Sequence, residues 1–490
     1  MAKVVIATFF SGMAIHMFGL VNVLHNYDSI GVVRGYGSSL VSGRWALYFL
    51  GEFALRTWEC YNLPFFNGAI FLLLIAVSAG VIYLVFQFDS WKKGALAGIL
   101  LAAHPAVTSV LFFKYTAVFY GLAILLAVAA VWCAEKMKYG ILLSALCTAV
   151  SVGIYQAYLP LTISLFILLL IKHILENNMT VKKFFSRGIY YCACILLGMI
   201  FYFVILKICL QVYHVALSSY QGISSMGNLS ISQIPALLKN AVVSFLKLPV
   251  EDYCGLAPTG TLKIGYLLLA VLCIFVVFRN VLAVKKPGNA FMFAIAGILF
   301  PVAVNFIVIM CPQSDIYTLM VCGFVAILFV PVVLLDRMGR IAKGLTCAVL
   351  IVMICNYIYL DNVNYTAMYY TNRQTENYLS TMVAQVRSTE GYDTSKKWAF
   401  IGDNIRDPQF RNPWSAAPLY GGNARSYINR YSRNRWIQQF YGYEISFEDA
   451  ETVSELKKNE QVKSMPCWPD SGSVKVIEDT VVIKLEDTDS

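Results

Sequence analysis

Long apolar runs alternate with short polar segments over the first 360 residues of the chain. About eleven of these runs are long enough to cross a hydrocarbon core roughly 30 Å thick. They lie at 4–24, 64–88, 94–111, 115–133, 139–155, 157–174, 188–212, 262–278, 290–310, 317–335 and 345–360. The pattern therefore predicts an α-helical, polytopic membrane domain over residues 1–360, followed by a polar region over residues 361–490.

The polar region mixes helical and strand patterns and is long enough for a small domain. Helical patterns cover residues 366–387, 434–441 and 448–458. Residues 397–402 are predicted to form a strand, and residues 474–477 and 481–485 a β-hairpin. We expect a small α+β domain.

Positive charges follow the same alternation. Basic clusters occupy every second loop, at Lys92/Lys93, Lys136/Lys138, Lys172/Lys182/Lys183/Arg187, Arg279/Lys285/Lys286 and Arg337/Arg340/Lys343. The positive-inside rule places these loops and the N-terminus in the cytoplasm. The loops at 25–62, 214–261 and 311–316, and the C-terminal domain, are then extracytoplasmic, at the plasma (inner) membrane.

This distribution explains much of the net charge of +10, so the charge does not indicate a nucleic-acid partner. Hydrophobic residues make up 58% of the chain and charged residues 13%, which excludes an ordinary soluble domain with roughly 25% charged residues. Within the loop 214–261, residues 231–248 have apolar positions at helical spacing. They predict an amphipathic helix in the membrane interface, or alternatively a re-entrant segment or a short extra span.

Neither a phosphate-binding glycine loop nor a metal-ligand cluster occurs in the sequence, so no cofactor is expected. A metal requirement stays open, because Asp28, Asp252 and Asp315 could converge in three dimensions. The cytoplasmic loops are short and basic, whereas the polar residues are predicted outside. A sugar donor used there is most simply a lipid-linked one.

The loop 25–62 carries the charged residues with the strongest case for chemistry. Asp28 lies just beyond the first apolar run, where a carboxylate can act as general base on an acceptor hydroxyl. The alternative is a structural turn, a common use of Asp in a sequence such as Asn26–Ser29. Inverting transfer needs only one base when the leaving group is a phosphate, which departs without protonation.

Candidate phosphate-binding residues are Arg44, Arg34 and Lys114. Arg44 stands in Ser42-Gly-Arg-Trp45, and its guanidinium can bind phosphate in a bidentate manner or stack on aromatic rings. The alternatives are anchoring among lipid headgroups for the arginines and snorkelling to the interface for Lys114.

Candidate sugar- and acceptor-binding residues are Trp45, Tyr120, Tyr155, Gln156 and His104. Polar side chains at membrane depth are costly unless they line a cavity or find a partner. Tyr155 and Gln156 could instead form a polar turn, and His104 is more simply a helix–helix hydrogen bond.

Three short motifs resemble the bacterial glucosyltransferase II family, within the membrane-embedded GT-C class of glycosyltransferases. They are Asn26-Tyr-Asp28, Ser42-Gly-Arg-Trp45 and Gly153-Ile-Tyr-Gln-Ala157. The chain ending is also similar, with Met465-Pro-Cys-Trp-Pro469 and Val481-Val-Ile-Lys-Leu485.

The resemblance implies an enzyme that moves a sugar, typically glucose, from a polyprenyl-phosphate carrier to a surface polysaccharide or glycolipid acceptor. The catalytic acid of this class lies in the first outside loop and maps onto Asp28. Many members have two adjacent acids there, whereas here Ser29 follows Asp28. Two other classes stay open: a flippase or transporter of lipid-linked sugars, and a non-catalytic membrane subunit.

Overall fold

The computed structural model describes residues 1–226, 230–284, 287–403, 409, 413–414, 420 and 430–487. The chain folds into two compact units. The first unit comprises Met1–Val21 and Arg34–Asn362, and the second comprises Asn22–Val33 and Val363–Ser490. A short segment near the N-terminus therefore folds with the C-terminal residues.

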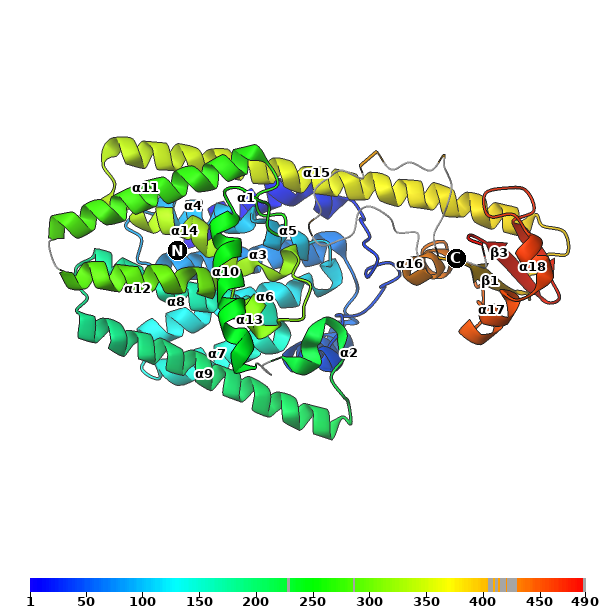
Figure 1. The fold of residues 1–490 in the computed structure, drawn as a ribbon, viewed down its shortest axis with the longest axis horizontal. Coiled ribbons are helices and arrows are strands. Elements are labelled where there is room, and N and C mark those ends of the chain that lie inside the picture. The colour runs from blue at the N-terminus through cyan, green and yellow to red at the C-terminus, as the bar shows by residue number, and fades with distance from the viewer. Residues whose placement is uncertain are drawn as a thin grey trace. The chain divides into compact units, whose positions relative to one another are not determined.

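The first unit is helical (Figure 1). Its helices are α1 (Ala2–Val21), α2 (Trp45–Trp58), α3 (Pro64–Val85), α4 (Trp91–Ala102), α5 (Pro105–Val110), α6 (Lys114–Lys136), α7 (Gly140–Ile154), α8 (Leu159–Leu175), α9 (Val181–Val212), α10 (Ile234–Lys247), α11 (Gly260–Val284), α12 (Pro287–Val304), α13 (Ile307–Met310), α14 (Val325–Leu334) and the first half of α15 (Arg340–Arg387). Short 3-10 segments join them at Leu40–Ser42, Gln156–Tyr158, Tyr220–Ser225, Ile231–Gln233, Thr318–Met320, Cys322–Phe324 and Leu335–Arg337.

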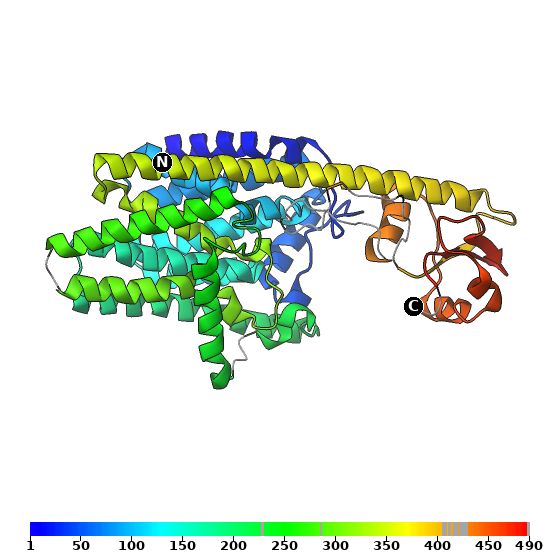
Figure 2. The same ribbon diagram turned by 45° about the horizontal axis from the view of Figure 1, so that its top comes forward.

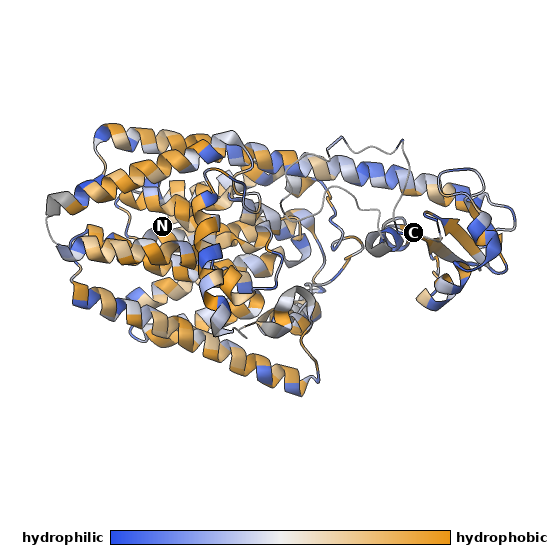
Figure 3. Ribbon diagram, viewed as in Figure 1, coloured by the Kyte–Doolittle hydropathy of each residue, from blue (hydrophilic) through white to orange (hydrophobic). Residues whose placement is uncertain are grey.

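Helices α1, α3, α6, α7 and α9 pack successively side by side (Figure 2), and apolar residues predominate along them (Figure 3). Small residues allow the close approach that packing in lipid requires. At Gly121 of α6, an added Cβ would lie 2.9 Å from the Phe71 ring of α3. Any larger residue at this position would push the two helices apart.

Eight helices among the described residues are long and apolar enough to cross a membrane, which agrees with a membrane protein. They are Ala2–Val21, Pro64–Val85, Lys114–Lys136, Gln156–Leu175, Val181–Val212, Gly260–Val281, Pro287–Val304 and Arg340–Arg387. Three of the eleven expected runs form shorter helices instead. Run 94–111 is divided between α4 and α5, run 139–155 forms the 15-residue α7, and run 317–335 contains the 10-residue α14.

The break between α4 and α5 has a clear local cause. Pro105 stands at the first position of α5, where its missing N–H is tolerated. The residue before a proline avoids the helical region, and His104 is extended, with φ −70° and ψ 134°. The sequence pattern is thus continuous in hydropathy but interrupted in backbone conformation.

The second unit is built on a three-stranded sheet of β1 (Lys397–Ile401), β2 (Val474–Ile477) and β3 (Thr480–Lys484), in the order β1-β3-β2. Strand β1 is parallel to β3, and β2 and β3 form the expected antiparallel hairpin. The other elements are α16 (Arg430–Arg435), a π-helical turn (Trp436–Phe440), α17 (Ala450–Leu456), α18 (Glu460–Ser464) and the second half of α15.

Because successive side chains of a strand point to opposite faces of the sheet, the strands contribute to two hydrophobic cores. Val481 and Ile483 of β3 face a cluster that includes Trp398 and Trp436, whereas Val482 faces Val462 and other residues of a smaller cluster. The sheet therefore lies between two hydrophobic layers.

One expectation about the chain's organisation changes, and one is met. The span expected to end at residue 360 and the helix expected at 366–387 form one 48-residue helix, α15. Helix α10 forms where an amphipathic helix was predicted, and it buries Leu237 and Ala241 while Leu246 is exposed. Lys285 and Lys286 of one predicted basic cluster lie outside the described residues.

Candidate functional site

The first unit brings together two motifs that lie more than a hundred residues apart. The Gln156 side-chain amide donates a hydrogen bond to the Ser42 carbonyl at 2.8 Å. The Tyr202 hydroxyl of α9 donates to the Gly43 carbonyl at 3.0 Å. Gly43 has φ +71°, and a Cβ there would meet Tyr202 and Gln156 at 2.9–3.0 Å. The Ser42–Trp45 turn is therefore held by side chains that only a glycine allows so close.

Arg44 lies at the centre of a group of tyrosines. One guanidinium nitrogen donates to the Tyr120 hydroxyl at 3.1 Å, and the guanidinium lies over the Tyr155 ring, 4.8 Å from its centroid. Tyr120 and Tyr155 are stacked at 4.6 Å, and the Tyr158 ring meets Tyr155 edge-on at 5.3 Å. Arg44 is thus positioned by aromatic rings and not by a salt bridge.

The electrostatics around Arg44 suit an anion. Burial alone would lower the pKa of Arg44, but the phenol oxygens of Tyr120 and Tyr155 raise it above its ordinary value. Among the residues that the structure describes, no carboxylate pairs with this guanidinium, and its Nε is buried without a hydrogen-bond partner. Arg44 is half-buried, and hydrogen bonds from a charged donor to an anion are stronger than those between neutral groups.

The structure distributes the other predicted residues around this group. Trp45 is buried beside Gly153, and its indole nitrogen has no hydrogen-bond partner among the described residues. Lys114 is buried and donates to the Gly19 carbonyl. Arg34 is exposed, paired with Glu59, and lies over the Tyr61 ring.

His104 takes part in a different buried contact. Its Nδ1 accepts a hydrogen bond from the Ala106 N–H, which caps α5, and its ring lies 6.3 Å from that of Tyr357 on α15. One turn further along both helices, the Thr108 hydroxyl donates to the Asp361 carboxylate at 2.8 Å. His104 therefore belongs to the packing of α5 on α15.

Asp28 belongs to the second unit, whereas Arg44 and the tyrosines belong to the first. The Asn26 side chain accepts hydrogen bonds from the N–H groups of Asp28 and Ser29, at 2.9 and 2.7 Å. A structural turn over Asn26–Ser29 was the alternative explanation for this stretch of sequence. The turn fixes the backbone, while the Asp28 side chain itself is half-buried.

The surroundings of Asp28 explain why it folds with the C-terminal residues. Ile30 is fully buried in the tryptophan-containing core. The His25 N–H donates to the Asn372 side chain at 2.8 Å, and the same side chain donates back to the His25 carbonyl at 3.0 Å. The segment is thus attached through both a hydrophobic and a polar contact.

Sequence reasoning missed Tyr158, Tyr202 and Asp361. Tyr158 stands three residues after Tyr155, so its spacing could have revealed it, and its hydroxyl has no partner among the described residues. Asp361 was treated as the first residue of the polar region, but it is fully buried in α15. Nothing in the sequence identifies Tyr202 of α9, whose role depends on the packing against Gly43.

The three acids considered for a metal site, Asp28, Asp252 and Asp315, are divided between the two units. Asp28 lies in the second unit, and Asp252 in the first unit accepts hydrogen bonds from the N–H groups of Gly255 and Ala257. Among the described residues, no group of three or more His, Cys, Asp or Glu side chains could hold a metal ion.

Comparison with known families identifies the chain's relatives. The family model described as glucosyl transferase GtrII matches residues 17–328 of the 490. The chain belongs to the glucosyl transferase GtrII family. It is therefore a glycosyltransferase, an enzyme that needs a sugar donor and an acceptor. Neither the search of curated proteins nor that of solved structures finds a match.

The GtrII match includes Asp28, the Ser42–Trp45 turn, Lys114 and the motif around Gln156. It ends before α15, so the resemblance of the chain ending lies outside the matched residues. The second unit is covered by the match only through its segment Asn22–Val33.

Proposed function

We propose that this GtrII-family enzyme transfers glucose from a polyprenyl-phosphate donor to a cell-surface polysaccharide or glycolipid. The observation that carries the proposal is Arg44. Its charged guanidinium is positioned by phenol rings and offers donors to an anion, as recognition of the donor phosphate requires.

The proposed reaction inverts the sugar's configuration. Asp28 deprotonates the acceptor hydroxyl, which attacks the anomeric carbon, and the bond to the lipid phosphate breaks with its electrons on the phosphate oxygen. Arg44 and Lys114 stabilise the charge that develops on this leaving group. Arg34 contributes less, because Glu59 already neutralises it. Tyr120, Tyr155, Gln156 and Trp45 orient the sugar.

The proposal includes a GT-C arrangement of about eleven spans, which counts the shorter segments 94–111, 139–155 and 317–335 as crossings. Residues 1–360 form the membrane catalytic domain and residues 361–490 the extracytoplasmic domain. The N-terminus is cytoplasmic. These assignments rest on the alternation of basic loops.

The test is turnover of polyprenyl-phosphate glucose by the purified full-length protein in detergent, with products read by mass. We expect wild type to release polyprenyl phosphate and Asp28→Asn to lose several orders of magnitude in rate. The matched control is Asp470→Asn, an exposed acid of the same unit, which should retain the wild-type rate.

Equal turnover by wild type and Asp28→Asn would refute the base assignment. Bound but unconverted lipid in the wild type would favour the transporter class.

A further inference from the structure

The second unit contains a pocket that the transfer reaction described above does not use. Its cavity volume is about 280 Å³. Pockets for drug-sized molecules occupy roughly 300–1,000 Å³, so this one has room for a single sugar ring but not for a longer chain.

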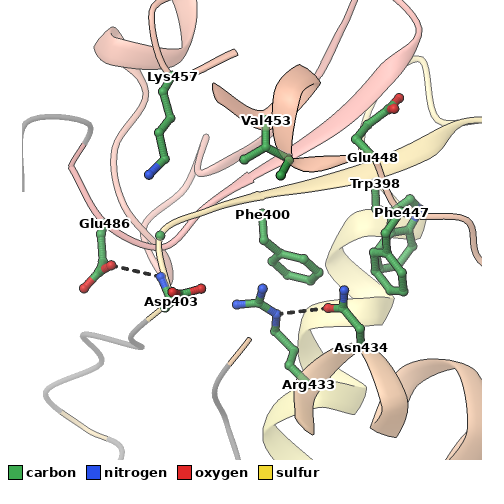
Figure 4. A pocket seen from close by; sticks show the side chains of 12 residues that line it. Trp398, Phe400, Asp403, Arg433, Asn434, Phe447, Glu448, Val453, Lys457 and Glu486 are labelled. Atoms are coloured by element: carbon green, nitrogen blue, oxygen red, sulfur yellow. Dashed lines mark hydrogen bonds between the residues drawn. The ribbon is translucent and has the colours of Figure 1, made fainter. Parts of the chain in front are cut away.

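The lining comes from three parts of the second unit (Figure 4). Ala450 and Val453 of α17 and Lys457, which caps its C-terminal end, follow one another at spacings of three and four residues. Arg433 and Asn434 lie across the pocket from these residues. The remaining lining residues belong to or adjoin β1 and β3: Trp398, Phe400, Gly402, Asp403, Phe447, Glu448 and Glu486.

The floor of the pocket is aromatic and rigid. The Arg433 guanidinium lies 3.7 Å from the centroid of the Phe400 ring and is itself buried. Phe447 is half-buried, 6.0 Å from Phe400 and perpendicular to Trp398. Phe447 therefore offers an aromatic surface on which the C–H face of a sugar ring can pack.

Among the described residues, the charges around this floor balance once the ion pair between Lys397 and Glu448 is counted. Three carboxylates and two cations line the pocket: Asp403, Glu448 and Glu486 against Arg433 and Lys457. One of the two cations is already stacked on Phe400. The balanced charge offers a phosphate or uronic acid no net attraction, whereas sugar hydroxyls can donate to carboxylates and accept from Lys457.

The carboxylates are fixed in place before any ligand binds. Glu448 accepts a hydrogen bond from the Thr480 hydroxyl at 2.9 Å. Glu486 accepts one from the Asp403 N–H at 2.9 Å. Glu448 also pairs with the Lys397 ammonium at 3.4 Å. Because a carboxylate has about four acceptor positions, Glu448 can still accept a hydrogen bond from a hydroxyl.

We propose that this pocket binds one neutral sugar unit of the acceptor glycan. The assignment of the glycan as acceptor rests on the proposed transferase function, whereas binding of a neutral sugar does not. The pocket would retain the growing or receiving chain beside the membrane between transfer events.

The test uses a variant that fills the pocket and leaves the buried residues around it unchanged. Ala450 is exposed at the start of α17, so Ala450→Trp fills the cavity from its open side. Ser454→Trp is the matched control, because Ser454 is exposed on the same helix but does not line the pocket. Thermal unfolding of both variants establishes that they fold.

The probe is a panel of immobilised neutral hexose oligosaccharides, beside a matched panel carrying uronic acids or phosphates, with full-length protein in detergent. We expect wild type and Ser454→Trp to bind the neutral panel, and Ala450→Trp to bind at least tenfold more weakly. Absence of neutral binding, equal binding by Ala450→Trp, or preference for the anionic panel would each overturn the proposal.

Release of polyprenyl phosphate, measured on the same preparations with water as acceptor, separates this proposal from the enzymatic one. Ala450→Trp should leave that release unchanged while it weakens glycan binding. If no preparation releases polyprenyl phosphate but neutral glycans still bind through the pocket, the sugar site stands and the proposed donor is wrong.

Discussion

Arg44 in the first unit and Arg433 in the second both stack on an aromatic ring, yet their surroundings differ in charge. Arg44 lies over Tyr155 and bonds to a phenol, with no acid paired to it among the described residues. Arg433 lies over Phe400 in a pocket lined by three carboxylates. The comparison motivates the two proposals: an arginine without a paired acid is assigned to an anion, and one among carboxylates to a neutral polar site.

The largest expected loss of activity follows substitution of Arg44, which removes one side of this comparison. Removing one preorganised charge-stabilising donor typically costs 10²–10³ in rate, so we expect about that loss in donor turnover for Arg44→Ala. Arg44→Lys should recover only part of it, because an ammonium cannot bind bidentately. The measurement is kcat/KM for polyprenyl-phosphate glucose. Arg34→Ala, at an exposed pair with Glu59, is the comparison and should lose far less.

Gln156→Leu tests whether the turn carrying Arg44 must be held in place. The change removes the 2.8 Å hydrogen bond and leaves the buried Ser42 carbonyl unpaired, at a cost of about 1–3 kcal/mol. We expect roughly a tenfold higher KM for the donor as the turn loosens. Gln438→Leu, at an exposed glutamine of the second unit, should leave the KM unchanged.

Lys484→Met tests the second unit separately. The Lys484 ammonium is buried and donates to the Lys463 and Met465 carbonyls, at 2.9 and 2.7 Å, at the end of α18. Without it these carbonyls lose a partner, and we expect about 1–3 kcal/mol of destabilisation. Hydrogen exchange of α18 and β3 in the full-length protein measures the effect. Faster exchange in the first unit would contradict the separation of the two units.

The smallest effect concerns α17, which forms one side of the sugar pocket. Asp449 caps this helix: the Thr452 N–H and then the Thr452 side chain lower the Asp449 pKa below its ordinary value of 3.8. A lowered folded-state pKa means that its stabilisation is present above the ordinary value and is lost as the pH falls through the lowered one.

The protection of α17 against hydrogen exchange, relative to the intrinsic exchange rate at each pH, should therefore fall below about pH 4 in wild type. Asp449→Asn keeps a good capping group without the titration, so its exchange protection should not change with pH in that range. Asp449→Ala should lose protection at every pH. A pH profile in Asp449→Asn that matches the wild-type profile would refute the assignment.

Much of the architecture followed from local pattern. Hydropathy located the long apolar helices, and β-type alternation located Lys397–Ile401 and the C-terminal hairpin. The hydropathy pattern failed at α15. Asp361 and Asn362 look like the end of a span in the sequence, yet a single pair of polar residues does not stop a helix. Asp361 is accommodated there by the Thr108 hydroxyl, a partner 253 positions away.

Some of the residues proposed from the sequence lie together in the structure. Trp45, Tyr120, Tyr155 and Gln156 were recognised from composition and position, and the structure places them around Arg44. Tyr202 was not, because nothing near it in sequence marks its contact with Gly43.

The sequence by itself determined that this is a membrane protein with a small polar domain, and the motifs it carries belong to the glucosyl transferase GtrII family. Those properties depend on hydropathy and on short motifs, and both are visible in short stretches of the sequence. Only the tertiary structure decided that Asp28 folds with the C-terminal unit and that Arg433 stacks on Phe400 in a pocket. Such contacts join residues far apart in the chain, and burial, not local preference, selects them.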